Sequence, residues 1–444
     1  MRLIRRLSLP QLVLFAATVL FVGGAGVVAA CKTPEIDCNL LVPEFFKKTP
    51  LTITDVVQGE IALPAGFTTE TVASGLDQPV TFDFLPDGRI LIGERSGLVR
   101  LAEQGRLAEQ PILDLRARVA TEYWRGLVAL AVDPDFEVNA FVYVVYAVRP
   151  TGDPKSATVV RVSRFALTET SAGEEVVILG AGGDKTDSCT ALPSSADCLP
   201  SDVDHIGADI AFGDDGTLFI STGDGGGLEA VEETAFRAQD IDALGGKILH
   251  VTRDGLGLET NPFFAGDPSA NRSKVWAVGL RNPFRLTLTS AGLPIVADVG
   301  WRVTDEIDAA PAGVNLGWPC YEGEARTMEY EATTQCQALY QEAAVPRGPL
   351  IVLPHPDASS VIGGVIYDGD AYPDEYRGSY FYGDWGFSWI RHVRVDPQSG
   401  ELDGKPQPFA EAAGGPTAFH IGPDGLLYVL SLNHGKVHRI DYSR

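Results

Sequence analysis

Hydrophobic and polar positions alternate in short runs along this chain, and the runs are separated by turns. The clearest unit is an Asp-Gly turn followed by alternating aliphatic and aromatic residues, which occurs at residues 86–92, 214–220 and 423–429. Weaker copies lie at residues 139–144, 291–296 and 367–369. An Asp-Gly pair between two hydrophobic runs is a strong signal for a β-hairpin. The pattern therefore predicts an all-β protein made of repeated hairpins.

The six copies indicate six structural repeats, with turns near positions 88, 139, 216, 292, 369 and 425. Repeated hairpins at quasi-regular spacing are typical of β-propeller blades, so we expect a six-bladed β-propeller. A ring must be closed, and we expect residues 436–442 to pair with an early strand at residues 67–73. Helical periodicity is nearly absent, and residues 229–242 are the best candidate for a short helix.

The N-terminus has the pattern of an export signal over residues 1–30. Arg2, Arg5 and Arg6 precede an apolar run at residues 12–28 that ends in small residues. An uncleaved anchor is the alternative, although the run is slightly short for a bilayer and contains glycines. Residues 31–55 are expected to form a tether. No linker divides the remainder, so residues 56–444 are expected to form one propeller domain.

The six cysteines fall into three close pairs, which are Cys31/Cys38, Cys189/Cys198 and Cys320/Cys336. Exported chains usually pair their cysteines, so three local disulfides are expected. Residues 28–31 also resemble a lipobox, which would make Cys31 a lipid anchor and leave Cys38 unpaired. Both readings place the protein outside the cytoplasm, as a secreted, periplasmic or cell-surface protein.

The formal net charge of −24 and the pI near 4.6 restrict the partners. Such a chain repels nucleic acid and anionic membranes. It also offers many carboxylates to hard cations such as Ca²⁺.

The Asp204-His205 step is the first candidate for chemistry. His205 is one of only 7 histidines, and it precedes both an Asp-Gly hairpin and the glycine-rich run at residues 221–226. Imidazole is the side chain best suited to moving protons near neutral pH. A loop that leads into a blade is well placed to face the mouth of the channel. A histidine that makes one structural hydrogen bond is the alternative.

Several short motifs, weak individually, are specific in their order and spacing. They occur at residues 84–88, 93–95, 126–127, 133–136, 204–213, 245–248, 279–283, 298–300, 305–307, 315–319 and 363–367. Together the motifs resemble the soluble glucose/sorbosone dehydrogenases, which include aldose sugar dehydrogenases that use pyrroloquinoline quinone (PQQ). The resemblance covers nearly all of the chain after residue 60, and the family is a six-bladed propeller.

The resemblance implies that an aldose is oxidised at its anomeric carbon, with PQQ as acceptor and an external partner receiving the electrons. His205 would take the proton from the sugar hydroxyl, and Asp204 would orient the imidazole or contact the cofactor. Arg281 and Asn282 match the family's Arg-Asn step, where a guanidinium stabilises the reduced quinone. Trp124 occupies a further cofactor-contact position.

The resemblance also implies a Ca²⁺ ion that polarises the quinone. Gly300 and Trp301 lie where the family offers backbone carbonyls to this ion. Asp305 and Glu306 follow and are candidate carboxylate ligands for this calcium or a second one.

Three positions depart from the family pattern. Trp124 stands where a glutamine is usual, Asp368 where a lysine is usual, and Asp384 where basic residues are usual. Because PQQ is a tricarboxylate, these replacements are expected to weaken its binding. Arg125, Arg302 and Arg391 are the cations that could compensate for the lost contacts to PQQ from other positions.

Two other functions therefore stay open. The first is a non-enzymatic extracellular propeller that binds a glycan or a protein, as in hedgehog-interacting-type proteins. The second is a metal-dependent lactonase, which would need several acids around one metal at the channel mouth. Its candidate ligands are Asp204, Asp224, Asp298 and Asp384.

Overall fold

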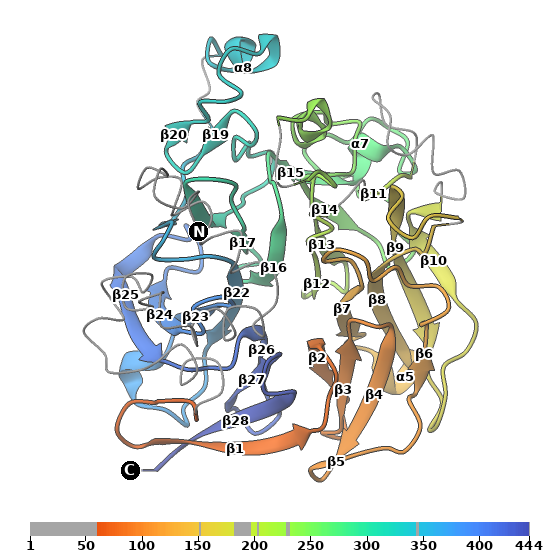
Figure 1. The fold of residues 1–444 in the computed structure, drawn as a ribbon, viewed down its shortest axis with the longest axis vertical. Helices are drawn as coiled ribbons and strands as arrows, with labels where there is room; N and C mark the ends of the chain where they lie inside the picture. The colour runs from red at the N-terminus through yellow and green to blue at the C-terminus, as the bar shows by residue number, and fades with distance from the viewer. Residues whose placement is uncertain are drawn as a thin grey trace, which may run out of the picture.

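Six antiparallel sheets stand side by side in the computed structural model (Figure 1). The structure describes residues 60–150, 152–181, 197–201, 204–227, 231–342 and 346–443. The first strand of each sheet contacts the first strand of the next, and the sixth sheet contacts the first. This cyclic order is that of a six-bladed β-propeller, so the predicted fold is confirmed.

Each blade is built from consecutive strands, beginning at the innermost. The first blade is β2 (Pro79–Phe84), β3 (Ile90–Glu94), β4 (Leu98–Glu103) and β5 (Arg106–Leu107), with β6 (Leu113–Asp114) beside β4. The second is β7 (Leu127–Val132), β8 (Phe141–Ala147), β9 (Thr158–Ala166) and β10 (Val176–Leu179), with β11 (Pro200–Ser201) beside β9. The third is β12 (Ala208–Phe212), β13 (Leu218–Thr222), β14 (Lys247–Val251) and β15 (Val275–Val278).

The fourth blade is β16 (Pro283–Leu288), β17 (Pro294–Asp298), β18 (Thr304–Ala309) and β21 (Ile351–Pro354). The fifth is β22 (Val361–Tyr367), β23 (Ser379–Asp384), β24 (Ile390–Val395) and β25 (Leu402–Ala410). The sixth is β26 (Pro416–Ile421), β27 (Leu427–Ser431), β28 (Lys436–Tyr442) and β1 (Phe67–Ser74). The core lies largely between neighbouring blades, as where Leu91, Leu127 and Val144 pack together.

The ring closes through its N-terminal strand. β1 crosses the bottom of Figure 1 and pairs antiparallel with β28, with Phe67 opposite Tyr442 and Ser74 opposite Lys436. The predicted pairing of residues 67–73 with 436–442 is thus confirmed. It hides the edge that an open sheet would present to other chains.

The predicted turns all join the first strand of a blade to its second. Gly88, Gly216, Gly292 and Gly425 have φ angles of 87°, 75°, 76° and 74°. These angles lie in the left-handed region that glycine adopts without steric cost. The local chemistry of the turn therefore explains why the repeat is visible in the sequence.

Helices are few and short in the described parts of the chain. Residues 229 and 230 of the helix expected at residues 229–242 lie outside the described residues, and within the rest of that range Glu233–Ala238 forms the 3₁₀ helix η4. Other short helices are α5 (Phe136–Asn139), α7 (Asn271–Lys274), α8 (Thr334–Leu339) and the 3₁₀ helix η5 (Asp374–Tyr376). None of the described helices is long and apolar enough to span a membrane.

An excursion at residues 310–350, between β18 and β21, rises above the ring at the top of Figure 1. It carries the hairpin of β19 (Tyr321–Glu322) and β20 (Ala325–Arg326), together with α8. A disulfide joins Cys320 to Cys336, as expected from their proximity in the sequence. Cys198 is also disulfide-bonded, whereas Cys31, Cys38 and Cys189 lie outside the described residues.

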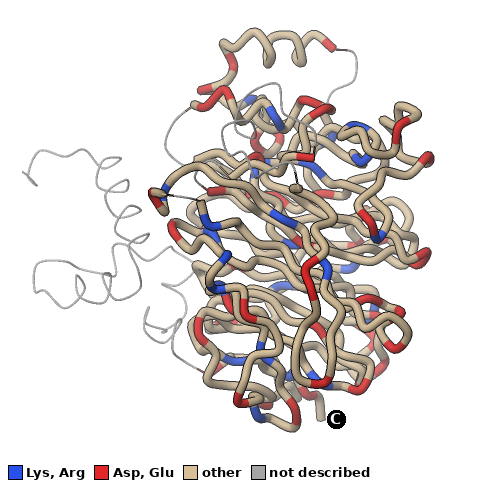
Figure 2. The backbone as a smooth tube through the Cα atoms, turned by 90° about the vertical axis from the view of Figure 1, so that its right-hand side faces the viewer, with Lys and Arg blue, Asp and Glu red and all other residues tan. Residues whose placement is uncertain are grey.

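Strand direction determines which loops share an end of the ring. The segments before the first strands lie at the same end as the segments between the second and third strands, because neighbouring strands are antiparallel. His205, Asp224 and Arg281 all belong to such segments. Asp368 follows β22 and therefore lies at the opposite end, with the Asp-Gly turns. Acidic positions are spread over many loops of the molecule (Figure 2).

Candidate functional site

His205 is buried at the start of the third blade, just before β12. Its side chain is only 3% exposed, and its Nδ1 lies 2.9 Å from Oδ1 of Asp224. Its Nε2 is buried and has no hydrogen-bond partner among the described residues. The backbone φ of His205 is 40°, which is uncommon for a residue other than glycine. A strained histidine with one committed nitrogen and one uncommitted nitrogen is typical of a functional site.

The glycine-rich run at residues 221–226 packs against this histidine. A Cβ on Gly223 would lie 1.8 Å from the carbonyl oxygen of His205, so no larger residue fits there. The N–H of Gly225 donates to the same carbonyl oxygen at 3.2 Å. Close backbone approach, and not flexibility, explains the glycine at position 223.

Asp224 has no exposed carboxylate oxygen to spare. Besides His205, its Oδ1 accepts from the N–H of Gly226 at 2.8 Å, and its Oδ2 accepts from the indole N–H of Trp318 at 2.8 Å. Burial opposes its ionisation, but the charge of His205, their hydrogen bond and the charge of Arg281 lower its pKa overall. An ionised carboxylate only accepts hydrogen bonds, so Nδ1 of His205 carries a proton, and in the neutral imidazole the lone pair is then on Nε2.

The carboxylate that contacts the imidazole is therefore that of Asp224, which the sequence placed in the glycine-rich run and among the candidate ligands of a lactonase metal. Asp204 has a different contact, since its Oδ1 accepts from the backbone N–H of Trp124 at 3.3 Å. Burial raises the pKa of Asp204. Asp204 thus anchors the loop before β7, which carries Trp124.

Arg281 and Asn282 begin the fourth blade and are held through their backbone. Their N–H groups donate to the two carboxylate oxygens of Asp298 at 2.8 and 2.6 Å. The guanidinium of Arg281 donates from Nη1 to the carbonyls of Val299 and Gly300, at 2.9 and 2.5 Å. Its Nε and Nη2 are buried without a partner in the described part of the chain. Two nitrogens of this cation, which carry three N–H groups, therefore have no partner among the described residues.

The loop at residues 300–304 wraps around one carboxylate of the excursion. Oε1 of Glu322 accepts from the N–H groups of Trp301, Arg302 and Val303 at 2.7, 2.7 and 2.9 Å, and from Thr304 at 3.3 Å. Glu322 is 4% exposed. No motif in the sequence marked this residue, because its partners lie on another strand.

The expected calcium ligands have structural partners in this arrangement. Gly300 accepts from Arg281, as described above. Oδ1 of Asp305 accepts from Gly300 N–H and His355 Nε2, both at 3.0 Å, and Oδ2 accepts from Val361 N–H at 2.9 Å. Glu306 accepts from the N–H of Gly323 at 2.7 Å.

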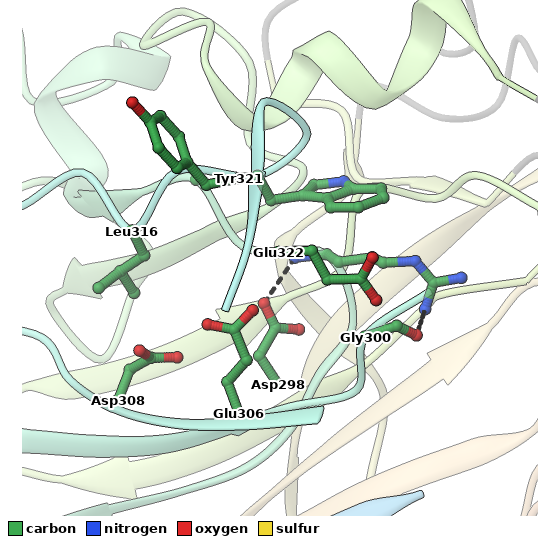
Figure 3. A pocket seen from close by; sticks show the side chains of 10 residues that line it. Asp298, Gly300, Glu306, Asp308, Leu316, Tyr321 and Glu322 are labelled. Carbon is green, nitrogen blue, oxygen red and sulfur yellow. Dashed lines mark hydrogen bonds between the residues drawn. The ribbon is translucent and has the colours of Figure 1, made fainter. Parts of the chain in front are cut away.

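A small cavity of about 10 Å³ lies between Arg281 and this acidic group. In Figure 3 the carboxylates of Asp298, Glu306 and Glu322 gather beside it, and dashed lines mark the contacts of Arg281 with Asp298 and Gly300. Burial raises the pKa of Asp298 to about 7 and that of Glu306 well above its ordinary value. Within the described residues, no three His, Cys, Asp or Glu side chains are arranged to hold a metal ion.

The charge departures noted in the sequence have less effect than their residue types suggest. Asp384 is buried, and its oxygens accept from the N–H groups of Ser359, Ser360 and Phe387 at 2.9, 2.8 and 2.7 Å. Asp368 lies at the far end of the ring. Arg125 is buried and donates to Ser201 and Ser156.

The other two arginines have aromatic partners. The guanidinium of Arg302 lies 4.3 Å from the centre of a Trp301 ring, and that of Arg391 lies 4.2 Å from a Trp389 ring. Arg302 also pairs with Glu329 at 3.2 Å. The three arginines are thus engaged with the protein.

Comparisons with known proteins agree with the resemblance in the sequence. The chain is 29% identical to an uncharacterized protein of Synechocystis, over 96% of this chain and 98% of that protein. It is 25% identical to an aldose sugar dehydrogenase of Escherichia coli, over 83% of this chain and 91% of that protein.

Solved structures share the fold. A glucose dehydrogenase matches with a TM-score of 0.68 at 25% identity, over 85% of this chain and 100% of that chain. The PQQ-bound aldose sugar dehydrogenase of Streptomyces coelicolor matches with a TM-score of 0.63 at 22% identity, over 86% of this chain and 100% of that chain. The family model described as glucose/sorbosone dehydrogenase matches residues 76–439, and the chain therefore belongs to that family.

Proposed function

We propose that this protein oxidises an aldose at its anomeric carbon and uses PQQ as the acceptor. The observation that carries the proposal is the pairing of Nδ1 of His205 with Asp224, which leaves Nε2 buried and without a partner among the described residues. Family membership and the sugar dehydrogenase of Escherichia coli support the substrate class. An external acceptor would then reoxidise the quinone.

The donors of the site fit an anionic quinone. Nε and Nη2 of Arg281 are buried without partners among the described residues, and a carboxylate or quinone oxygen would satisfy them. PQQ, when bound, supplies the two-electron acceptor. Asp204 and Asn282 are further cofactor contacts of this proposal, and Trp124, which the resemblance placed beside the cofactor, lies on the adjoining loop.

The residues of the chain handle the proton and the charge. Nε2 of His205 takes the proton of the C1 hydroxyl, and Asp224 stabilises the imidazolium that results. Arg281 provides a fixed positive charge beside the place where negative charge develops. Burial of the pair keeps water from competing for the proton.

Calcium is the less well supported part of the proposal. Gly300 and Trp301 would supply carbonyl oxygens, with Asp305 or Glu306 nearby. The carbonyl of Gly300 already accepts from a cation of the protein, and Asp305 has its oxygens committed. Calcium at Gly300 would therefore share that carbonyl oxygen with the guanidinium of Arg281, whose positive charge opposes the ion.

The location is proposed from residues 1–30, which carry the export pattern. A lipid anchor at Cys31 and a Cys31–Cys38 disulfide remain the two alternatives for the mature N-terminus. Both place the propeller outside the cytoplasm, where the disulfide at Cys320 can form.

The test is reconstitution of the exported protein with PQQ, with and without Ca²⁺, followed by dye reduction across a panel of aldoses. We expect activity that falls roughly 10³-fold in kcat for His205→Ala. His420→Ala, on another blade, is the matched control and should keep full activity. A protein that takes up no PQQ at high micromolar concentration, as judged by its absorbance, would favour the non-enzymatic binding propeller.

A further inference from the structure

Two large aromatic side chains stand exposed beside the His205 site. Tyr123 is 48% exposed and Trp124 is 46% exposed. The ring of Trp124 meets that of Trp385, from the fifth blade, edge to face at 5.5 Å and 70°. Exposed aromatic groups are costly in water and commonly mark binding surfaces.

The loop that carries these aromatics is held rigidly. Nη1 of Arg95 donates to the carbonyls of Thr121, Tyr123 and Arg125 at 3.1, 3.0 and 3.2 Å. Tyr123 adopts a φ of 58°, which is strained for an aromatic residue. One guanidinium thus fixes three carbonyls of the segment whose Tyr123 and Trp124 side chains face solvent. Backbone strain kept in place by surrounding contacts is consistent with a ligand site.

The same loop is joined directly to the proton-transfer residues. The N–H of Trp124 donates to Asp204, the neighbour of His205 in the chain. The loop precedes β7, so it shares an end of the ring with His205 and Arg281. A ligand stacked on Trp124 would therefore extend from the reacting position.

The charges around the loop indicate a neutral ligand. The carboxylates of Asp77, Asp204 and Glu122 lie within electrostatic reach of Arg95, whose guanidinium is committed to backbone carbonyls. The guanidinium groups of Arg95 and Arg125, the latter 5.8 Å from the centre of the Tyr123 ring, offset these carboxylates, so the loop gives a charged ligand little net attraction. The apolar C–H face of a pyranose ring is neutral and packs well on an indole ring.

We propose that Trp124 and Trp385 form a stacking site for a neutral pyranose ring next to His205, and that Tyr123 contacts the following sugar unit. The inference rests on the proposed function for the identity of the reacting sugar. The binding itself needs neither PQQ nor His205. The substrate class is accordingly an oligosaccharide whose reducing end reaches His205, in preference to a free monosaccharide.

The experiment is calorimetric titration of the exported, quinone-free protein with glucose, cellotriose and maltotriose. We expect at least one trisaccharide to bind more tightly than glucose. Trp124→Ala should weaken that binding about tenfold, whereas Trp124→Phe should restore most of it. Val138→Ala, an exposed apolar position at the far end of the ring, is the matched surface control.

The outcomes separate this inference from the proposed function. Trisaccharide binding that persists in a protein inactive with PQQ would keep the sugar site and remove the dehydrogenase. Equal binding by Trp124→Ala and the unmodified protein would overturn the sugar site, as would the absence of trisaccharide binding. A Trp124→Ala protein that loses PQQ affinity but keeps sugar affinity would assign the indole to the cofactor and also overturn it. Unfolding temperature checks that each variant is folded.

Discussion

The carboxylate of Glu322 offers a sharp test of how the site is held. One oxygen accepts from four backbone N–H groups of the loop at residues 301–304, and the residue is 4% exposed. Glu322→Ala would leave these donors without their acceptor. Because the same loop contains Gly300 and Trp301, the perturbation reaches the proposed calcium carbonyls as well.

The magnitude follows from two opposing effects. Removing a buried, hydrogen-bonded charge costs about 3–5 kcal/mol when its partners stay unpaired. Removing it also relieves repulsion with Glu306, whose pKa Glu322 helps to raise, and this offsets about 1 kcal/mol. We therefore expect Glu322→Ala to lower the free energy of unfolding by about 2–4 kcal/mol. Glu322→Gln keeps one acceptor oxygen and should lose only about 1–2 kcal/mol.

The assay is urea unfolding of the full chain with its disulfides intact. Glu331→Ala, an exposed carboxylate on the same excursion with 48% of its side chain accessible, should change stability by less than about 0.5 kcal/mol. A Glu322→Ala protein that unfolds within that margin of the unmodified protein would refute the reasoning. A Glu322→Gln protein as unstable as Glu322→Ala would also refute it, since the shared acceptor would then not be the cause.

Three further predictions concern other contacts. Asp224→Asn replaces one acceptor oxygen with an amide NH2 group, which cannot accept the N–H of His205 or of Trp318 on that side. The kcat with PQQ should therefore fall roughly 10³-fold, whereas Trp318→Phe should lose much less activity. Cys320→Ser removes a disulfide that joins residues 16 positions apart and should lower the free energy of unfolding in urea by about 3 kcal/mol. Under reducing conditions the variant and the unmodified protein should be equally stable, because both then lack the crosslink. Burial lowers the pKa of His438 to about 4, so the folded protein holds this histidine neutral. The stability of the unmodified protein relative to His438→Leu should therefore be constant above about pH 6.5 and decline as the pH falls toward 4. A difference that does not depend on pH would contradict this.

The fold could be predicted because its signals are local. Each Asp-Gly turn needs only neighbouring residues to specify a hairpin, and the closure of the ring follows once six hairpins are counted. The short helix expected at residues 229–242 is present only as a 3₁₀ helix at residues 233–238, and four consecutive residues of it, 235–238, are buried, which is not the pattern of an amphipathic α-helix.

The site could be predicted only where its residues lie next to one another in the chain. His205 and Arg281 were found through adjacent motifs. Asp224 pairs with His205, 19 residues earlier, and with Trp318, 94 residues later, and Glu322 holds a loop about 20 residues earlier on another strand. Pairings of this kind depend on the arrangement of the blades, which no single stretch of sequence encodes.

Asp384 illustrates why residue type alone misjudges electrostatics. In the sequence, an acid in place of the family's basic residues suggests repulsion of a tricarboxylate. In the fold, three backbone N–H groups face its oxygens, and their dipoles offset much of the negative field that it would otherwise project. Asp368 is at the wrong end of the ring to act on the site at all. Of the three departures from the family pattern, only Trp124 is then left as an argument against PQQ binding. If the indole of Trp124 stacks a sugar, the replacement of the family's glutamine at this position changes the substrate and does not exclude the cofactor.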